Sequence, residues 1–155
     1  MASKVIWISR FGPGAVGGIE HILRSLIDAD KIRLVVCMRE SGVLPRYYIE
    51  NGVGILELEN FGRIGKVDLN ISMFFIVFVI SLFARSKIIV NLPFVQALPL
   101  LMLRFKQVFY FVHGFSSTGI IGALHKKLLL ALTKEQKVIS TTRDSARLFH
   151  ESTEC

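Results

Sequence analysis

The sequence predicts an α/β fold: a doubly wound, mostly parallel, Rossmann-like sheet within a single domain. Short β-branched and aromatic runs alternate along the 155 residues with longer segments whose apolar residues recur at helical spacing. The hydrophobic fraction of 52% is high and the charged fraction of 20% is low, as expected for strands that are buried on both faces. A chain near this length buries roughly 70% of its unfolded surface, which is enough for one core.

The first part of the chain predicts three strands and two helices. Strands are expected at residues 5–9 (VIWIS), 32–38 (IRLVVCM) and 53–58, because these runs are rich in β-branched residues. Between the first two strands, a glycine-rich loop precedes a helix with apolar residues at helical spacing, namely Ile19, Ile22, Leu23, Leu26 and Ile27. Residues 44–51 (LPRYYIEN) are expected to form a short helix, with Gly52 as its C-terminal cap glycine.

The second part predicts a long apolar helix followed by further alternation. This helix is expected to start near Val67, with Asp68 in its first turn, and to end at residues 85–87, where basic side chains suit the helix dipole. The remaining elements are expected as strands at 88–90, 108–112 and 138–140 and as helices at 94–105, 120–132 and 142–149.

Ligands of such sheets bind beyond the carboxyl ends of the strands. The segments in those positions are residues 10–18, 39–42, 91–93, 113–117 and 140–143. These five segments are therefore the candidates for a binding site.

The first of these segments contains Gly12, Gly14 and Gly17, which match the dinucleotide-binding pattern G-x-G-x-x-G. Two features weigh against a dinucleotide site. The helix would have to open within the glycines, and the acidic residue expected at the end of the second strand, near residues 35–38, has only Glu40 as a late substitute.

A longer loop, in which Gly17 and Gly18 open the helix, is the favoured interpretation. Free backbone N–H groups at the positive end of the helix dipole can then approach a phosphate closely. The alternative is a turn that only needs a positive φ. Glu20 can favour the helix dipole, and His21 can face solvent.

Three stretches carry a family resemblance: GGIEHIL after the first strand, VHGF after the fifth strand, and KVISTTRDSARLF near the end. In this order they resemble the N-terminal Rossmann domain of GT-B glycosyltransferases, especially the retaining family four that uses nucleotide sugars. The resemblance implies that residues 1–155 are the acceptor-side half of a GT-B fold, and that the C-terminal donor-binding domain is absent.

The resemblance also implies roles for particular residues. Gly17, Gly18 and Glu20 would lie by the diphosphate of the donor, and His113 would line the cleft near the sugar and acceptor as the catalytic candidate. A capping or packing histidine is the alternative for His113.

Three further residues are candidate ligand contacts. Ser140 corresponds to the serine-containing turn after the last strand of such domains, although a hydroxyl there can equally cap the next helix. Arg143 could add an anion contact, and Arg10, directly after the first strand, is a second basic candidate beside the phosphate site.

The implied reaction transfers a sugar from a nucleotide-diphosphate sugar to a glycan or lipid-linked acceptor, as in polysaccharide biosynthesis. No E-x7-E pattern follows a glycine-rich loop in residues 149–155, so we expect no appreciable turnover from these residues alone. No tightly bound cofactor is expected, and no metal site, because no His/Asp/Glu cluster has ligand spacing.

Two other classes of protein stay open: a noncatalytic anchoring subunit of a split glycosyltransferase, and an NAD(P)-binding oxidoreductase domain. The net charge of +7 favours partners with phosphate groups or an anionic membrane surface. Nucleic acid is not expected, because the basic residues are scattered without interleaved aromatic residues.

A cytoplasmic location, with possible peripheral attachment to the membrane, is expected. Cys37 and Cys155 lie far apart, as in a reducing compartment, and the N-terminus lacks the features of a signal peptide. A helix over the apolar residues 71–84 would rise about 21 Å, short of the roughly 30 Å hydrocarbon core. A buried helix or an interfacial one, helped by Lys126 and Lys127, are the two interpretations.

Overall fold

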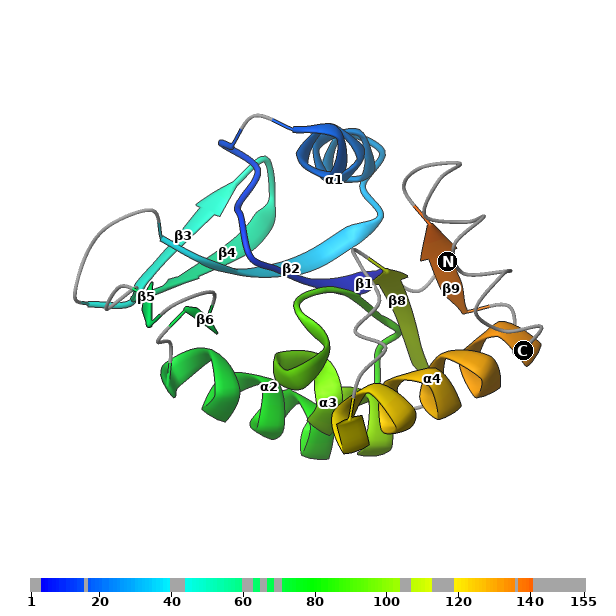
Figure 1. Cartoon of the computed structure of the whole chain (residues 1–155). Helices are drawn as coiled ribbons and strands as arrows, with labels where there is room; N and C mark the ends of the chain where they lie inside the picture. Colours follow the sequence, from blue (N-terminus) through cyan, green and yellow to red (C-terminus); the bar gives the residue numbers. More distant parts are fainter. Residues whose placement is uncertain are drawn as a thin grey trace.

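A seven-stranded sheet in the order β3-β4-β2-β1-β7-β8-β9 forms the centre of the computed structural model (Figure 1). Every neighbouring pair is parallel except β3 and β4. The strands are β1 (Val5–Ser9), β2 (Ile32–Met38), β3 (Arg46–Glu50), β4 (Val53–Leu58), β7 (Ile88–Asn91), β8 (Val108–Val112) and β9 (Val138–Ser140). The structure describes residues 4–15, 17–39, 44–59, 63–64, 67–68, 71–103, 107–112, 119–135 and 137–140.

Helices cover both faces of the sheet. In Figure 1, α1 (Gly18–Asp28) lies on one face, and α2 (Ile71–Phe83), α3 (Phe94–Leu103) and α4 (Gly119–Lys134) lie on the other. The expectation of an α/β fold with a mostly parallel sheet is therefore confirmed. Without the edge strand β3, the strand order is compatible with a doubly wound, Rossmann-like sheet whose direction of winding changes between β1 and β7.

Alternate residues of each strand point to opposite faces of the sheet, where they pack in two separate cores. On the α1 side, Trp7 and Val35 pack with Leu23 of the helix, and the Trp7 ring lies 5.5 Å from the Phe111 ring, centroid to centroid. On the opposite side, the core consists of residues such as Ile8, Val36, Val90, Met73, Leu100 and Leu129. Burial on both faces explains why the strand sequences are almost continuously apolar.

The expectation of a short helix at residues 44–51 is wrong, because this segment contains the strand β3. β3 pairs antiparallel with β4, from Arg46 opposite Glu57 to Glu50 opposite Val53. Asn51 and Gly52 form the connecting turn, with φ of 49° and 75°. Two successive residues with positive φ are typical of the two-residue hairpin turn that Asn-Gly favours, so Gly52 closes a hairpin and does not cap a helix.

The expected start of the long apolar helix is also wrong. Residues Val67–Asp68 form β6, which pairs antiparallel with β5 (Arg63–Ile64) in a separate two-stranded ladder. The backbone groups of Val67 and Asp68 are thus used in that ladder, and α2 begins only at Ile71. At its other end α2 stops at Phe83, short of the expected residues 85–87.

The later elements agree with expectation to within a few residues, apart from the helix expected at 142–149, which lies outside the described residues. α3 includes Pro99, as the expected range did. In the part of the chain that the structure describes, no helix has both the length and the apolar content needed to cross a bilayer. The placement of this sheet in half of a GT-B fold stays a prediction.

We predict that Gly52→Ala lowers the free energy of unfolding by about 1 kcal/mol, because an alanine side chain is strained at positive φ. Urea denaturation followed by circular dichroism measures the change. Asn51→Gly is the matched control, since glycine adopts the same φ without strain, and it should stay within about 0.5 kcal/mol of the parent chain. A neutral Gly52→Ala variant would contradict this turn geometry.

Candidate functional site

The carboxyl ends of β1, β2 and β7 are joined by the backbone of Arg10. Its N–H donates to the carbonyl of Asn91 at 3.3 Å, and its carbonyl accepts from the N–H of Met38 at 3.1 Å. The Arg39 N–H extends the network to the carbonyl of Leu58, at 2.8 Å. Four strand ends therefore form one connected edge, and the loop that leaves β1 starts from a fixed point.

The glycine-rich loop over residues 10–17 is held in place from α1. The Arg24 guanidinium donates to the carbonyl oxygens of Pro13 and Ala15. Within the loop, the Ala15 N–H donates to the Gly12 carbonyl at 3.2 Å and closes a turn. A Cβ added at Gly12 would lie only 3.0 Å from Cys37 Sγ, so the loop backbone lies directly on the end of β2.

The start of α1 agrees with the longer-loop interpretation. The helix begins at Gly18, Gly17 is its N-cap with extended φ and ψ of 172° and 169°, and no side chain caps it. The His21 N–H donates to the Gly17 carbonyl at 3.1 Å as the first helical hydrogen bond. A Cβ added at Gly18 would meet no atom within 4 Å, so the space beside this residue is open.

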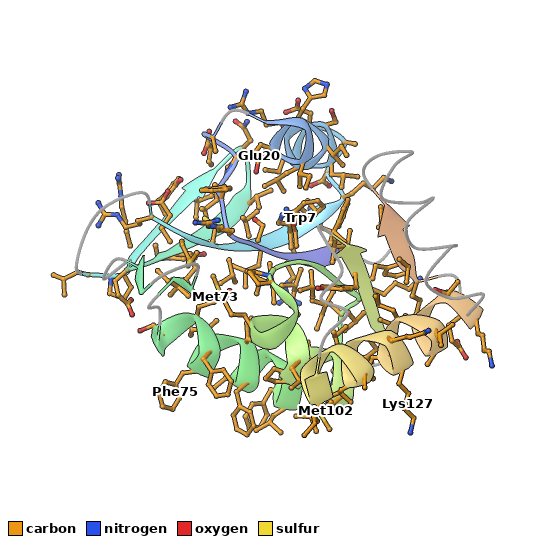
Figure 2. The ribbon with its side chains drawn as sticks, in the orientation of Figure 1. Trp7, Glu20, Met73, Phe75, Met102 and Lys127 are labelled. Carbon is orange, nitrogen blue, oxygen red and sulfur yellow. The ribbon has the colours of Figure 1, made fainter. Side chains whose placement is uncertain are left out.

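Glu20 occupies part of this helix end. Its side chain is buried, with 8% of the residue exposed. A Cβ added at Gly17 would overlap Glu20 Oε2 and lie 3.2 Å from Glu20 Cδ, so the carboxylate folds back against Gly17; Figure 2 shows where this residue lies on α1. A carboxylate in the first turn stabilises the helix dipole, and it also stands where a phosphate beside Gly17 would come to lie.

A hollow of about 320 Å³ lies between the glycine-rich loop and the ends of β2 and β4. This volume is at the lower end of the range for small-molecule sites. Its lining residues are Phe11, Gly12, Gly14, Ala15, Met38, Arg39 and Glu57. Next to it, the Arg10 guanidinium stacks over the Phe11 ring at 5.0 Å.

The polar wall of the hollow is a small network around Glu57. Arg39 Nε lies 3.9 Å from Glu57 Oε2, and the Tyr48 hydroxyl donates to Glu57 Oε1 at 3.0 Å. Arg39 also donates through Nη1 to the carbonyl of Leu44 at 3.2 Å. The hollow therefore presents one guanidinium, which can donate to an anionic group, and one carboxylate, which can accept from a hydroxyl group.

Two groups next to the hollow have raised pKa values. Burial, together with the charge of Glu57, raises the pKa of the Cys37 thiol to about 12. Burial and the hydrogen bond to Glu57 raise the pKa of Tyr48 to about 12. Both groups are neutral near pH 7, so Cys37 is a packing residue under the loop and not a thiolate nucleophile.

Two buried polar atoms lie at the junction of β1 and β7. Asn91 is 6% exposed, Trp7 is fully buried, and neither Asn91 Oδ1 nor Trp7 Nε1 has a hydrogen-bond partner among the residues that the structure describes. Ser9 pairs in register with Asn91, and its hydroxyl donates to the Phe11 carbonyl at 2.5 Å. Polar groups of β1 and β7 therefore lie next to the glycine-rich loop. This is the point in the sheet where the direction of winding changes.

The predicted site residues are only partly described by the structure. It places Gly17, Gly18 and Glu20 at the start of α1, and Arg10 at the other end of the glycine-rich loop, directly after β1. His113 and Arg143 lie outside the described residues, and for Ser140 only the backbone is described, as the end of β9, in register with Val112. Their roles stay predictions.

Sequence reasoning missed the network around Glu57. Arg39 fell within a candidate segment, but Glu57 lay inside an expected strand and Tyr48 inside an expected helix. The available signal was the Asn51-Gly52 pair, since a hairpin at that point places Tyr48 opposite Ile55, from where its hydroxyl reaches Glu57. Among the described residues, no group of three His, Cys, Asp or Glu side chains could hold a metal ion.

No protein-family model matches the chain, and neither a characterised protein nor a solved structure shows significant similarity to it.

We predict that Cys37 makes the folded chain less stable in alkali. The folded pKa near 12 exceeds the unfolded value of 9.0, so above pH 9 the unfolded chain releases a proton that the folded chain keeps. The stability that the neutral Cys37 thiol contributes is therefore fully present below pH 9, and it is lost as the pH rises toward 12. Between pH 8 and pH 10, the fall in unfolding free energy should be about 1 kcal/mol smaller in Cys37→Ala than in the parent chain. Urea titrations at both pH values measure the difference, and equal falls would contradict the assignment.

Proposed function

We propose that this chain is the N-terminal, acceptor-side half of a family-four-like GT-B glycosyltransferase. The proposed reaction transfers a sugar from a nucleotide-diphosphate sugar to a glycan or lipid-linked acceptor. One observation carries the proposal: α1 opens on two adjacent glycines, Gly17 and Gly18, at the carboxyl edge of a doubly wound sheet. The resemblance of the GGIEHIL, VHGF and KVISTTRDSARLF stretches to that family supports the same assignment.

In this proposal the start of α1 stabilises the leaving group. Breaking the bond between sugar and phosphate leaves negative charge on the diphosphate, and preorganised N–H groups aimed at that charge lower the barrier. The open space beside Gly18 allows a phosphate oxygen to approach the backbone. Arg10, at the other end of the glycine-rich loop, is the basic candidate for a second contact. The bonds from Arg24 to the loop keep these donors in place before the donor substrate binds.

In this proposal the Glu20 carboxylate must move away from Gly17 when the diphosphate binds. Its carboxylate and a phosphate would compete for the same helix end, and two negative groups at this spacing repel each other. Glu20 therefore stabilises the unliganded loop and weakens diphosphate binding until it rotates away. Once rotated, it still lies by the diphosphate, as the family resemblance implies, and it can accept a hydrogen bond from a hydroxyl group of the donor.

The proposed activity needs a second Rossmann domain to grip the nucleotide across a cleft. His113 would orient the sugar or acceptor from this half. Residues 1–155 by themselves would then bind diphosphate weakly and show no turnover, whether the second half belongs to the same chain or to another. In the latter case, this chain could serve as a noncatalytic anchoring subunit.

One observation favours a second candidate, an NAD(P)-binding domain. The hollow lies between the glycine-rich loop and the end of β2, where dinucleotide-binding sheets hold the adenosine ribose. Arg39 lines it, and an arginine at this place suits a 2′-phosphate. The start of α1 at Gly18, beyond the glycine pattern, counts against this candidate.

Two glycine variants separate the candidates. Gly18→Ala and Gly14→Ala both place a Cβ where no atom lies within 4 Å, so both should fold normally. In amide NMR titrations with UDP-glucose, we expect shifts at Gly18 and Ile19, and roughly tenfold weaker binding for Gly18→Ala, because the methyl group keeps the phosphate away from the backbone. Gly14→Ala is the control and should bind like the parent chain. Shifts with NADPH alone, lost in Gly14→Ala, would instead support the dinucleotide candidate.

Glu20→Gln tests the competition at the helix end. Removing the charge should tighten binding of UDP-glucose by a few-fold, and lower the unfolding free energy by roughly 0.5 kcal/mol through the lost dipole interaction. Asp28→Asn removes the same charge at the far end of α1 and should leave binding unchanged. Weaker binding in Glu20→Gln would mean that the carboxylate contacts the ligand directly in the bound state.

A further inference from the structure

The outer side of α2 is entirely apolar. Its exposed positions follow the spacing i, i+1, i+4, i+5, i+8, i+9, which forms one continuous stripe along a helix. They are Phe74, Phe75, Phe78, Val79, Leu82 and Phe83, between 42% and 75% exposed. Because a surface helix of a water-soluble domain normally carries polar residues on this side, the stripe requires a nonaqueous partner.

α3 extends this apolar surface. Met102 and Leu103 at its end are 62% and 52% exposed, and α2 packs against α3. Figure 2 shows Phe75 and Met102 projecting away from the sheet on the same side of the molecule. We call the six exposed residues of α2, together with Met102 and Leu103, the aromatic face.

The aromatic face is not needed for the core of the sheet. The inward side of α2 already supplies it through Met73 and Val77, which are fully buried against the strands. Ser81 on the same inward side donates its hydroxyl to the Val77 carbonyl at 2.6 Å. The two sides of α2 therefore have separate partners.

The helices that form and flank the aromatic face carry positive charge and no negative charge. α2, α3 and α4 contain no Asp or Glu, whereas Lys126 and Lys127 lie on α4 and Arg85 follows the end of α2. The described acidic residues nearest in sequence to these helices are Asp68, before α2, and Glu135, after α4. Figure 2 shows Lys127 pointing to the same side as Phe75 and Met102. By contrast, α1 on the opposite face of the sheet carries Glu20 and Asp28.

We propose that the aromatic face docks on the surface of an anionic lipid bilayer. Phenylalanines enter the boundary between headgroups and acyl chains, while Lys127 and Arg85 contact anionic headgroups. α2 lies along the sheet with its long side outward, the orientation of an interfacial helix (Figure 1). A second copy of this chain is a less suitable partner for the aromatic face, because pairing two such faces would bring their basic residues together. This inference stands independently of the proposed function.

Vesicle sedimentation of the full chain tests the proposal. We expect binding to phosphatidylglycerol vesicles at low salt, and much weaker binding to phosphatidylcholine vesicles. The double variant Phe75→Ser/Phe83→Ser should weaken binding roughly tenfold or more, since it removes two large apolar side chains from the interface. Lys127→Glu should reduce binding to the anionic vesicles only.

The edge strand β3 provides the matched control. Tyr47 and Ile49 are 62% and 68% exposed there, so Tyr47→Ser/Ile49→Ser removes comparable exposed apolar area away from the aromatic face. This control should bind vesicles like the parent chain, and circular dichroism should show an intact fold in both double variants.

A fluorescence readout gives an independent check. Phe75→Trp should show a blue-shifted emission when anionic vesicles are added, whereas Ile49→Trp should not, against the constant background of the fully buried Trp7. The proposal is overturned if the parent chain binds neither kind of vesicle, or if the Phe75→Ser/Phe83→Ser variant binds as well as the control. It is also overturned if sedimentation equilibrium shows a dimer that this variant abolishes while vesicles are not bound.

Discussion

The parallel pairing of β1 with β2 on one side and β7 on the other is the constraint on which the candidate site depends. Parallel strands end at the same edge, so this register brings Ser9, Cys37 and Asn91 to one level. The Arg10 backbone then ties the ends of β2 and β7 together just beyond that level. The glycine-rich loop, the start of α1 and the hollow are all built on this edge.

The two faces of the sheet differ in chemistry because they have different helical cover. On one face, α1 is amphipathic and carries both the acidic residue at its start and the arginine that holds the loop. On the other, α2 and α3 consist largely of apolar residues, and no acidic residue lies on any of the three helices there. Such an arrangement would allow a bilayer to cover one face while the candidate site at the carboxyl edge stays accessible, as the proposed transfer to a lipid-linked acceptor would need.

Glu20 illustrates a conflict between stability and the phosphate binding that is proposed for this helix end. The same helix end attracts its carboxylate and a phosphate, and for the same electrostatic reason. In the unliganded chain the carboxylate takes that position, supported by burial against Gly17. Sequence alone could place Glu20 in the first turn, but the direction of its side chain depends on packing around the loop.

The sequence by itself determined the elements whose signals are local. β-branched runs identified β1, β2, β4, β7, β8 and β9, and the paired glycines identified the start of α1. It did not determine β3, because the Asn51-Gly52 pair suits both a helix end and a hairpin, and pairing with β4 decides between them.

Only the tertiary structure brought Arg39, Tyr48 and Glu57 around one hollow, and only it showed that the phenylalanines of α2 face outward. Both outcomes depend on which surfaces of distant segments meet. The free energy of those contacts is not contained in the spacing of residues along any one segment.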